Sequence, residues 1–555
     1  MITFFNLKMN RLHFLVFVWI SFTACNSDLK EKGEPSRLNI LWITCEDMSP
    51  RLGCYGDPIA RTPNIDKLST EGIRYTNAFS VSGVCAPSRS CLITGMYPTT
   101  TGAMHMRTMT RTSAIAMITD PELLAIPTYE AVPAPEVRCF PEYLRAAGYY
   151  CTNNSKKDYQ FREPVTTWDE SSDNAHWRNR KPGQPFFAVF NFTTTHESQV
   201  WSRADDPSFT KPEEVDVPPY YPDSPIVRKD IARHYDNIAI MDSQVGDILS
   251  ELKEDGLMDS TIIFFYSDHG DGLPRAKRWI YDSGIKVPLI IRYPDGQFSG
   301  VTSNELVSFL DFAPTVLSLT GIEIPEYIQG KAFAGKQKTI SREYIYCAHD
   351  RMDPAMENQR GVRDKRYKYI RNYMPERPYV QFLPYRDQMN LMRELLRYER
   401  EGLLNETQAL WFRKIKPEEE LYDTQNDPWE ILNLADDPEY RDVLLKLREE
   451  HLIWKERTWD WGTMPETELI KHLWPPDGKQ PSTAEPTFRT KVLDDGQVEL
   501  EIISGTTGAS IGYKVNDENI WQVYHKPLKL SKPEKIQAFA HRIGFKPSRE
   551  VTGNL

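Results

Sequence analysis

The sequence predicts an α/β fold: a doubly wound, mostly parallel sheet flanked by helices, with a smaller antiparallel-sheet C-terminal subdomain and an appended small β-domain. Three observations predict it. Continuous apolar runs, typical of strands buried on both faces, alternate with helical patterns in the first part of the chain. After residue 340 apolar residues alternate with polar ones, as in antiparallel strands. Short strand-like segments then follow a stretch rich in Pro, Gly and Ser.

The composition is that of an ordinary globular protein with more than one domain. The chain has 555 residues, of which 40% are hydrophobic and 26% are charged. Its formal net charge of −11 argues against a nucleic-acid partner. An anionic ligand would therefore have to be captured by a local basic pocket.

The N-terminus has the features of a targeting segment. Two basic residues precede an apolar run, residues 12–22, which is too short to span a membrane and is soon followed by Cys25. Residues 1–25 resemble a bacterial lipoprotein signal peptide with Cys25 as the lipidated residue, and residues 26–36 are predicted to form a flexible tether. We expect an exported protein in the periplasm or at the cell surface, held at the outer membrane by a lipid anchor. An ordinary secretory signal cut nearby is the alternative.

The cysteines show neither a zinc-type spacing nor the density of a disulfide scaffold. There are eight in the chain, and we expect most of them to be buried small hydrophobic side chains. The sequence leaves open a disulfide between Cys139 and Cys151 or between Cys45 and Cys54.

The α/β domain is predicted to span residues 37–340. Its strands are expected at the apolar runs 38–44, 149–152, 185–192, 261–266 and 287–292. Helices are expected after Pro63, with Ile65, Leu68 and Ile73 as apolar positions, from Ser88 onward, up to Gly148, and over residues 230–255. Such alternation places the carboxyl ends of the parallel strands along one edge of the sheet.

The C-terminal part is predicted in three pieces. Residues 341–474 form the antiparallel subdomain, residues 475–486 a linker, and residues 487–555 a small β-sandwich domain. The expected strands are 344–346, 367–371, 498–503, 511–515 and 536–540, with a helix over 441–454.

Charged residues follow four of the predicted strands. They are Glu46 with Asp47, Lys156, His196, and Asp268 with His269. Ligands of doubly wound sheets bind at the carboxyl ends of the strands, so we expect these side chains to meet. The carboxylates form an oxygen-rich set that suits Ca²⁺ or Mg²⁺ better than zinc, although histidine is an unusual calcium ligand. The alternative is that the acidic pairs are helix caps or surface charges.

The segment Cys85-Ala86-Pro87-Ser88-Arg89 combines a cysteine, a proline and an arginine at a helix start. Pro87 disfavours helix at Ala86, so Cys85 is expected on a fixed turn before a helix that begins at Ser88. The N-terminus of a helix attracts anions, which favours an anion held near Cys85 and Arg89. A buried cysteine in a turn is the alternative.

Taken in order, these motifs resemble the type I, formylglycine-dependent sulfatases of the alkaline-phosphatase superfamily, as found among polysaccharide sulfatases of marine and gut bacteria. The resemblance covers residues 37–460. It rests on Asn39 to Asp47, on Cys85 to Arg89 with Leu92-Ile93-Thr94-Gly95, on Ser267-Asp268-His269-Gly270, on Tyr281 to Arg292, and on Glu420 to Asn433.

The resemblance implies a mechanism that begins at Cys85. A formylglycine-generating maturase converts this cysteine to formylglycine (3-oxoalanine), and the hydrated aldehyde is a gem-diol. One hydroxyl attacks the sulfur of a sulfate ester, and the other then expels sulfate by elimination. The implied metal ligands, for Ca²⁺ or Mg²⁺, are Glu46, Asp47, Cys85, Asp268 and His269.

The resemblance also implies roles around the substrate. Arg89, Lys156 and Lys277 neutralise the sulfate oxygens, and His196 protonates the leaving oxygen. His105 and Arg107 are candidate contacts to the sugar, with a structural role or a solvated surface position as the alternative.

Two departures from the family pattern concern the site. Glu46 stands where many members have aspartate, which puts its role as a ligand in doubt. Asp158 stands where many have a histidine that assists the release of sulfate.

The expected function is hydrolysis of sulfate esters in a sulfated polysaccharide or its oligosaccharides, such as a glycosaminoglycan or the algal polymer ulvan. One rival is a phosphoryl hydrolase of the same superfamily, but those enzymes use Ser or Thr where this chain has Cys85. The other is a non-catalytic carbohydrate-binding lipoprotein, which the retained set of catalytic residues argues against.

Overall fold

The computed structural model describes residues 37–110, 117–516, 518–531 and 534–554. The predicted signal peptide, Cys25 and the tether therefore lie outside the described residues. In the part of the chain that the structure describes, no helix has the length and apolar character needed to cross a membrane.

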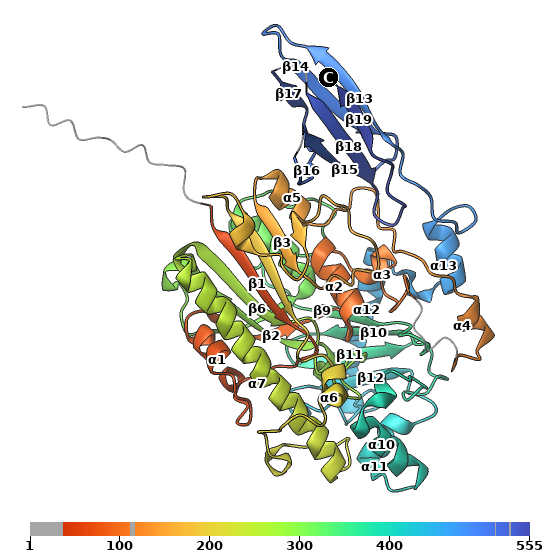
Figure 1. Cartoon of the computed structure of the whole chain (residues 1–555). Helices are drawn as coiled ribbons and strands as arrows, with labels where there is room; N and C mark the ends of the chain where they lie inside the picture. The colour runs from red at the N-terminus through yellow and green to blue at the C-terminus, as the bar shows by residue number, and fades with distance from the viewer. Residues whose placement is uncertain (1–36, 111–116, 517, 532–533, 555) are drawn as a thin grey trace, which may run out of the picture. The chain divides into compact units, whose positions relative to one another are not determined.

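The central sheet has eight strands in the order β4-β3-β5-β1-β6-β7-β2-β8 (Figure 1). Their bounds are β1 Asn39–Cys45, β2 Ile73–Phe79, β3 Tyr150–Asn154, β4 Glu170–Ser171, β5 Phe186–Phe192, β6 Thr261–Ser267, β7 Lys286–Arg292 and β8 Val301–Ser308. Only β7 runs antiparallel to its neighbours β6 and β2. The prediction of a mostly parallel sheet is confirmed.

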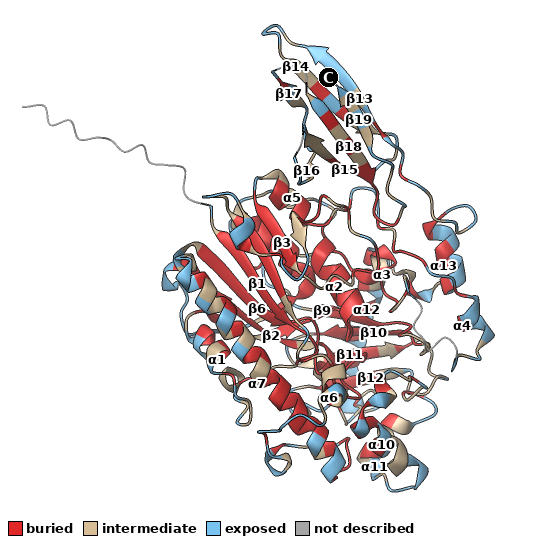
Figure 2. Ribbon diagram, viewed as in Figure 1, coloured by how far each residue is buried: buried red, intermediate tan, exposed pale blue. Residues whose placement is uncertain are grey.

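Helices cover both faces of this sheet. The helices of this part of the chain are α1 Pro63–Thr70, α2 Cys85–Thr94, α3 Pro98–Thr101, α4 Pro121–Ala125, α5 Pro141–Ala146, α6 Ser198–Ser202, α7 Pro225–Glu254, α8 Asp282–Ile285 and α9 Phe312–Thr320. On one face Ile40 and Trp42 of β1 pack with residues of α2, α5 and α9. On the other face Leu41 and Ile43 pack with α1 and α7. This alternation along a strand that is buried throughout confirms the doubly wound arrangement (Figure 2).

Several elements differ from the prediction. Ile73, expected on the helix after Pro63, is the first residue of β2, because that helix ends at Thr70. Gly72 permits the turn between them, since a Cβ there would lie 2.4 Å from the carbonyl oxygen of Ile291. The helix expected over residues 230–255 begins earlier, at Pro225, with Ser224 as its N-cap.

The antiparallel subdomain contains a four-stranded sheet in the order β12-β11-β10-β9. The strands are β9 Ile345–His349, β10 Gln359–Arg363, β11 Tyr367–Asn372 and β12 Glu419–Asp423, and the helices are α10 Asn390–Arg400, α11 Glu406–Ala409, α12 Arg441–Thr458 and α13 Glu466–Leu473. Arg363 and Lys368 of this sheet both form ion pairs with Asp282 of α8. These buried pairs fix the subdomain against the α/β domain.

Two further antiparallel sheets form the C-terminal β-domain, in the orders β13-β14-β17 and β16-β15-β18-β19. Their strands are β13 Pro486–Val492, β14 Val498–Ser504, β15 Ser510–Val515, β16 Gln522–Val523, β17 Leu528–Leu530, β18 Lys535–His541 and β19 Val551–Asn554. Leu500 and Leu530 from one sheet share a small core with Ile536 and Ala538 from the other. The three strands expected here correspond to β14, β15 and β18.

The cysteines of the described residues are all free, and all but Cys54 are buried. The disulfides that the sequence left open, Cys139 with Cys151 and Cys45 with Cys54, are therefore not formed.

Candidate active site

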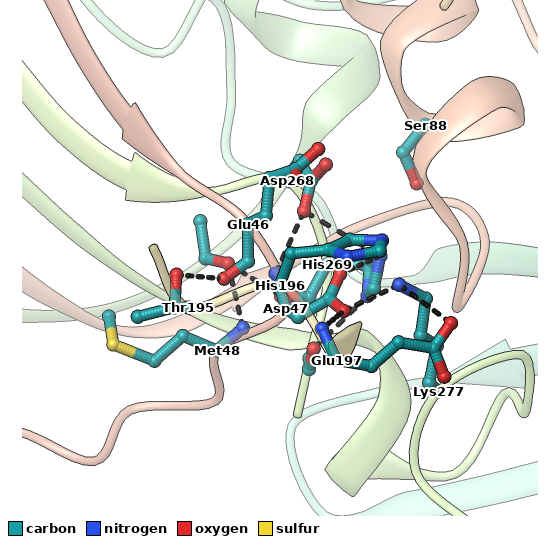
Figure 3. A network of polar contacts seen from close by, with 12 residues as sticks. Glu46, Asp47, Met48, Ser88, Thr195, His196, Glu197, Asp268, His269 and Lys277 are labelled. Carbon is teal, nitrogen blue, oxygen red and sulfur yellow. Dashed lines mark hydrogen bonds and ion pairs between the residues drawn. The ribbon is translucent and has the colours of Figure 1, made fainter. Parts of the chain in front are cut away.

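The strand ends meet as the sequence predicts. Glu46 and Asp47 follow β1, and Asp268 and His269 follow β6, its hydrogen-bonded neighbour. The backbone N–H of Asp47 donates to Asp268 Oδ1 at 3.2 Å, which joins the two ends. His196 follows β5 and turns into the same cluster (Figure 3). All of these carboxylates are buried.

Helix α2 begins at Cys85, with extended Val84 as its N-cap, so the expected start at Ser88 is wrong. Pro87 is tolerated in the first turn because the N–H groups there have no intrahelical partner. The Ser88 hydroxyl bonds to Ser82 O at 2.9 Å instead of capping the helix. Cys85 is thus the first helical residue, 1% exposed, and faces the carboxylates.

The ligand atoms needed for a cation converge on Cys85. Asp47, Cys85 and His269 form one group whose ligand atoms lie within 4.8 Å of one another, and Glu46, Cys85 and Asp268 form another. Glu46 Oε1, Asp47 Oδ1 and His269 Nε2 are all buried; Lys156 forms an ion pair with Glu46 Oε1, and His269 Nε2 lies 3.0 Å from Asp47 Oδ1. Buried carboxylates held this close together repel one another, and a divalent cation would neutralise them. The five predicted ligands therefore fit such an ion.

Calcium is expected to raise the melting temperature of the protein, because an ion that binds only the folded chain stabilises it. At a hundredfold excess over Kd the stabilisation is about 2.7 kcal/mol. Thermal unfolding in EDTA and in excess Ca²⁺ measures the shift. Asp268→Asn should lose most of the shift, whereas the surface control Asp259→Asn should keep it. An equal shift in Asp268→Asn would contradict the assigned site.

Three cations surround the carboxylates, and they are the three predicted to bind sulfate. Arg89 Nε lies 3.0 Å from Asp268 Oδ2, Lys277 Nζ lies 2.5 Å from Asp47 Oδ2, and Lys156 forms an ion pair with Glu46. Burial alone would lower the pKa of Lys277. The carboxylates of Asp47 and then Glu197 raise this pKa by more than burial lowers it, so the ammonium stays charged. The protein has a net negative charge, yet it gathers three cationic side chains at this site.

The charge around Cys85 favours an anion at this position. Burial raises the pKa of the Cys85 thiol, but Lys156 and Lys277 outweigh it, and the net pKa is about 6. For His196, burial and then Lys277 lower the pKa, while Asp47, Cys85 and Glu46 raise it to a net value above the usual 6.5. His196 Nδ1 lies 2.8 Å from Ser198 Oγ. A protonated His196 beside an anionic position 85 is suited to proton donation.

Glu197 and Arg278 complete the site and were not predicted. The Glu197 carboxylate accepts hydrogen bonds from both terminal nitrogens of Arg278, at 3.0 and 2.6 Å, and forms an ion pair with Lys277 at 3.2 Å. Its backbone N–H donates to Asp47 Oδ2 at 2.6 Å. Adjacency to His196 and Lys277 was the only signal in the sequence that could have pointed to them.

Arg107 is partly exposed and ion-paired with Asp158, whereas His105 is buried. Arg107 Nη1 is 3.5 Å from Asp158 Oδ1, and both residues have left-handed backbones, with φ of 61° and 58°. The His105 ring is 6% exposed, and its nitrogens have no hydrogen-bond partner among the described residues. Burial lowers the pKa of His105 to about 4, which keeps it neutral. That His105 contacts the sugar stays a prediction.

Comparison with known proteins gives consistent matches. A family model described as Sulfatase matches residues 38–322, and one described as N-sulphoglucosamine sulphohydrolase, C-terminal, matches residues 274–395. An ulvan-active sulfatase of Formosa agariphila is 44% identical over 99% of this chain and 98% of its own length. Human N-sulphoglucosamine sulphohydrolase is 24% identical over 79% of this chain and 94% of its own.

Solved structures resemble the fold. A 2-O GAG sulfatase superposes with a TM-score of 0.56 at 20% identity, over 77% of this chain and 93% of that one.

Proposed function

The chain belongs to the sulfatase family and is a sulfuric ester hydrolase, and from this premise we propose that it removes sulfate from a sulfated polysaccharide or its oligosaccharides. The observation that carries the reaction is the meeting of Arg89, Lys156 and Lys277 around Cys85, beside His196. The 44% identity to an ulvan-active sulfatase over nearly the whole chain supports a polymeric, carbohydrate substrate.

Position 85 is proposed to carry the nucleophile after a maturase has converted Cys85 to formylglycine. A Ca²⁺ or Mg²⁺ ion held by Glu46, Asp47, Asp268 and His269 would polarise the bound sulfate and acidify a hydroxyl at position 85. The convergence of these buried ligand atoms on Cys85, in two groups whose atoms lie within 4.8 Å of one another, supports this assignment.

The other residues of the site bind the anion and move a proton. Arg89, Lys156 and Lys277 are each paired with carboxylates, and a bound sulfate would give each a further anionic partner. Fixed cations aimed at oxygens that gain charge in the transition state are an effective source of rate enhancement. His196 gives its proton to the leaving oxygen of the sugar, which would otherwise depart as an alkoxide.

The direct test is release of inorganic sulfate by protein co-expressed with a formylglycine-generating maturase. Ion chromatography would follow sulfate from oligosaccharides of ulvan and of glycosaminoglycans, with phosphate monoesters as the control. We expect sulfate from at least one carbohydrate and little phosphate. Phosphate release without sulfate release would favour a phosphoryl hydrolase, and saccharide binding without turnover would favour a binding protein.

We also propose export and lipid anchoring at the outer membrane through Cys25, which rests on the sequence of residues 1–25 alone. Metabolic labelling with a palmitate analogue should mark the wild-type protein and leave Cys25→Ser unlabelled. A labelled Cys25→Ser protein would remove the basis for this anchor.

A further inference from the structure

An aromatic wall stands beside the proton donor of the site. It consists of Tyr385, from the C-terminal subdomain, and Trp201 of α6. The Tyr385 ring centroid lies 6.3 Å from that of His196 and 5.3 Å from that of Trp201, which meets it edge-on at 79°. Tyr385 is 38% exposed, so its ring is supported by Trp201 and still open to a ligand.

The reaction itself places the leaving group at this wall. A general acid must lie within hydrogen-bond reach of the oxygen that it protonates. The leaving oxygen therefore lies next to His196, between it and the sulfur held over Cys85. The sugar attached to that oxygen must fill the space around His196, and Tyr385 borders that space.

A cationic side chain also lies near this space, because Arg107 follows Met106, which packs with Cys85 in one apolar cluster. Burial lowers the pKa of Arg107, but Asp158 and then Cys85, Asp353 and Tyr385 raise it, so the guanidinium stays charged. At 3.5 Å its hydrogen bond to Asp158 is long, which leaves donors for a ligand.

Resting on the proposed function, we infer that Tyr385, buttressed by Trp201, is the platform on which the sugar bearing the sulfate packs. The C–H face of a pyranose carries partial positive charge and is apolar, and it suits the negative face of an aromatic ring. The site therefore selects carbohydrate esters by stacking, in addition to binding the sulfate itself.

Tyr385→Ala is the test, with inorganic sulfate as a probe of the anion subsite. We expect KM for a sulfated oligosaccharide to rise about tenfold, while the inhibition constant of inorganic sulfate stays unchanged. Tyr385→Phe keeps the ring and should keep the wild-type KM. Phe298→Ala, which removes a 47% exposed aromatic side chain in the turn between β7 and β8, is the matched control.

An unchanged KM in Tyr385→Ala would overturn the inference, as would a parallel loss of sulfate inhibition, which would show general damage to the site. Binding of a desulfated oligosaccharide to Cys85→Ala protein, with and without Tyr385→Ala, separates this inference from the proposed reaction. We expect the second substitution to weaken binding about tenfold even without turnover, and equal binding would reject the platform.

Discussion

Cys85→Ala is expected to abolish sulfate release, lowering kcat by about 10⁶-fold, the scale seen when a nucleophile is removed. Two of the three groups of candidate metal ligands include Cys85, and two of the three proposed sulfate-binding cations lower its pKa. The substitution removes only one buried atom from the first residue of α2, so the fold should persist. Steady-state sulfate release and the melting temperature measure the two effects.

The matched control for Cys85 lies on the same helix. Cys91 is fully buried in the apolar core, so Cys91→Ala should keep its activity. Mass spectrometry of the tryptic peptide that contains Cys85 should find the aldehyde in the active enzyme. Full activity in a preparation whose peptide carries only the thiol would sink the formylglycine assignment.

His196→Gln is expected to lower kcat on sugar sulfates by about 10²–10⁴-fold. Glutamine can hold a hydrogen bond but cannot give up a proton, so the leaving oxygen would depart as an alkoxide. The loss should be much smaller for an aryl sulfate, whose phenolate leaves without help. Comparing kcat for the two esters, with His176→Gln as a control at another partly buried histidine paired with Glu251, tests this role. Equal losses on both esters would contradict it.

The pH profile gives an independent measure of His196. Its pKa is raised above 6.5, and only the protonated form can donate. Activity should therefore be full below this pKa and fall as pH rises through it. In His196→Gln this alkaline fall in kcat should be absent, and an unchanged profile would assign it to another group.

The parts of the fold that the sequence predicted are those with strong local patterns. β1, β5 and β6 are apolar runs because helices cover both of their faces. β2 and β8 were missed, because their partly polar sequences pack at one side of the sheet and mimic loops. The predicted start of α2 was wrong because proline was expected to exclude the preceding Ala86 from the helix. In the first helical turn this restriction is weaker, and α2 begins at Cys85.

The sequence predicted those site residues that directly follow a strand. It did not predict those that reach the site only through tertiary contacts. Asp47, Asp268 and His196 follow apolar runs and share one edge of the sheet. Tyr385 reaches His196 only because the subdomain folds back over α6, and nothing near it in sequence marks a site. Glu197 could not be assigned to the site from the sequence, because its ion-pair partner Arg278 lies on a distant segment of the chain.

The burial of Cys85 also determines when this residue can be modified relative to folding. At 1% exposure, packed against the residues that follow β1 and β6, the thiol is out of reach of another enzyme's active site once the sheet has formed. Its conversion would have to come before folding is complete. With the export proposed above, modification would compete in time with both folding and translocation, and the relative rates of these three processes would set the yield of active enzyme.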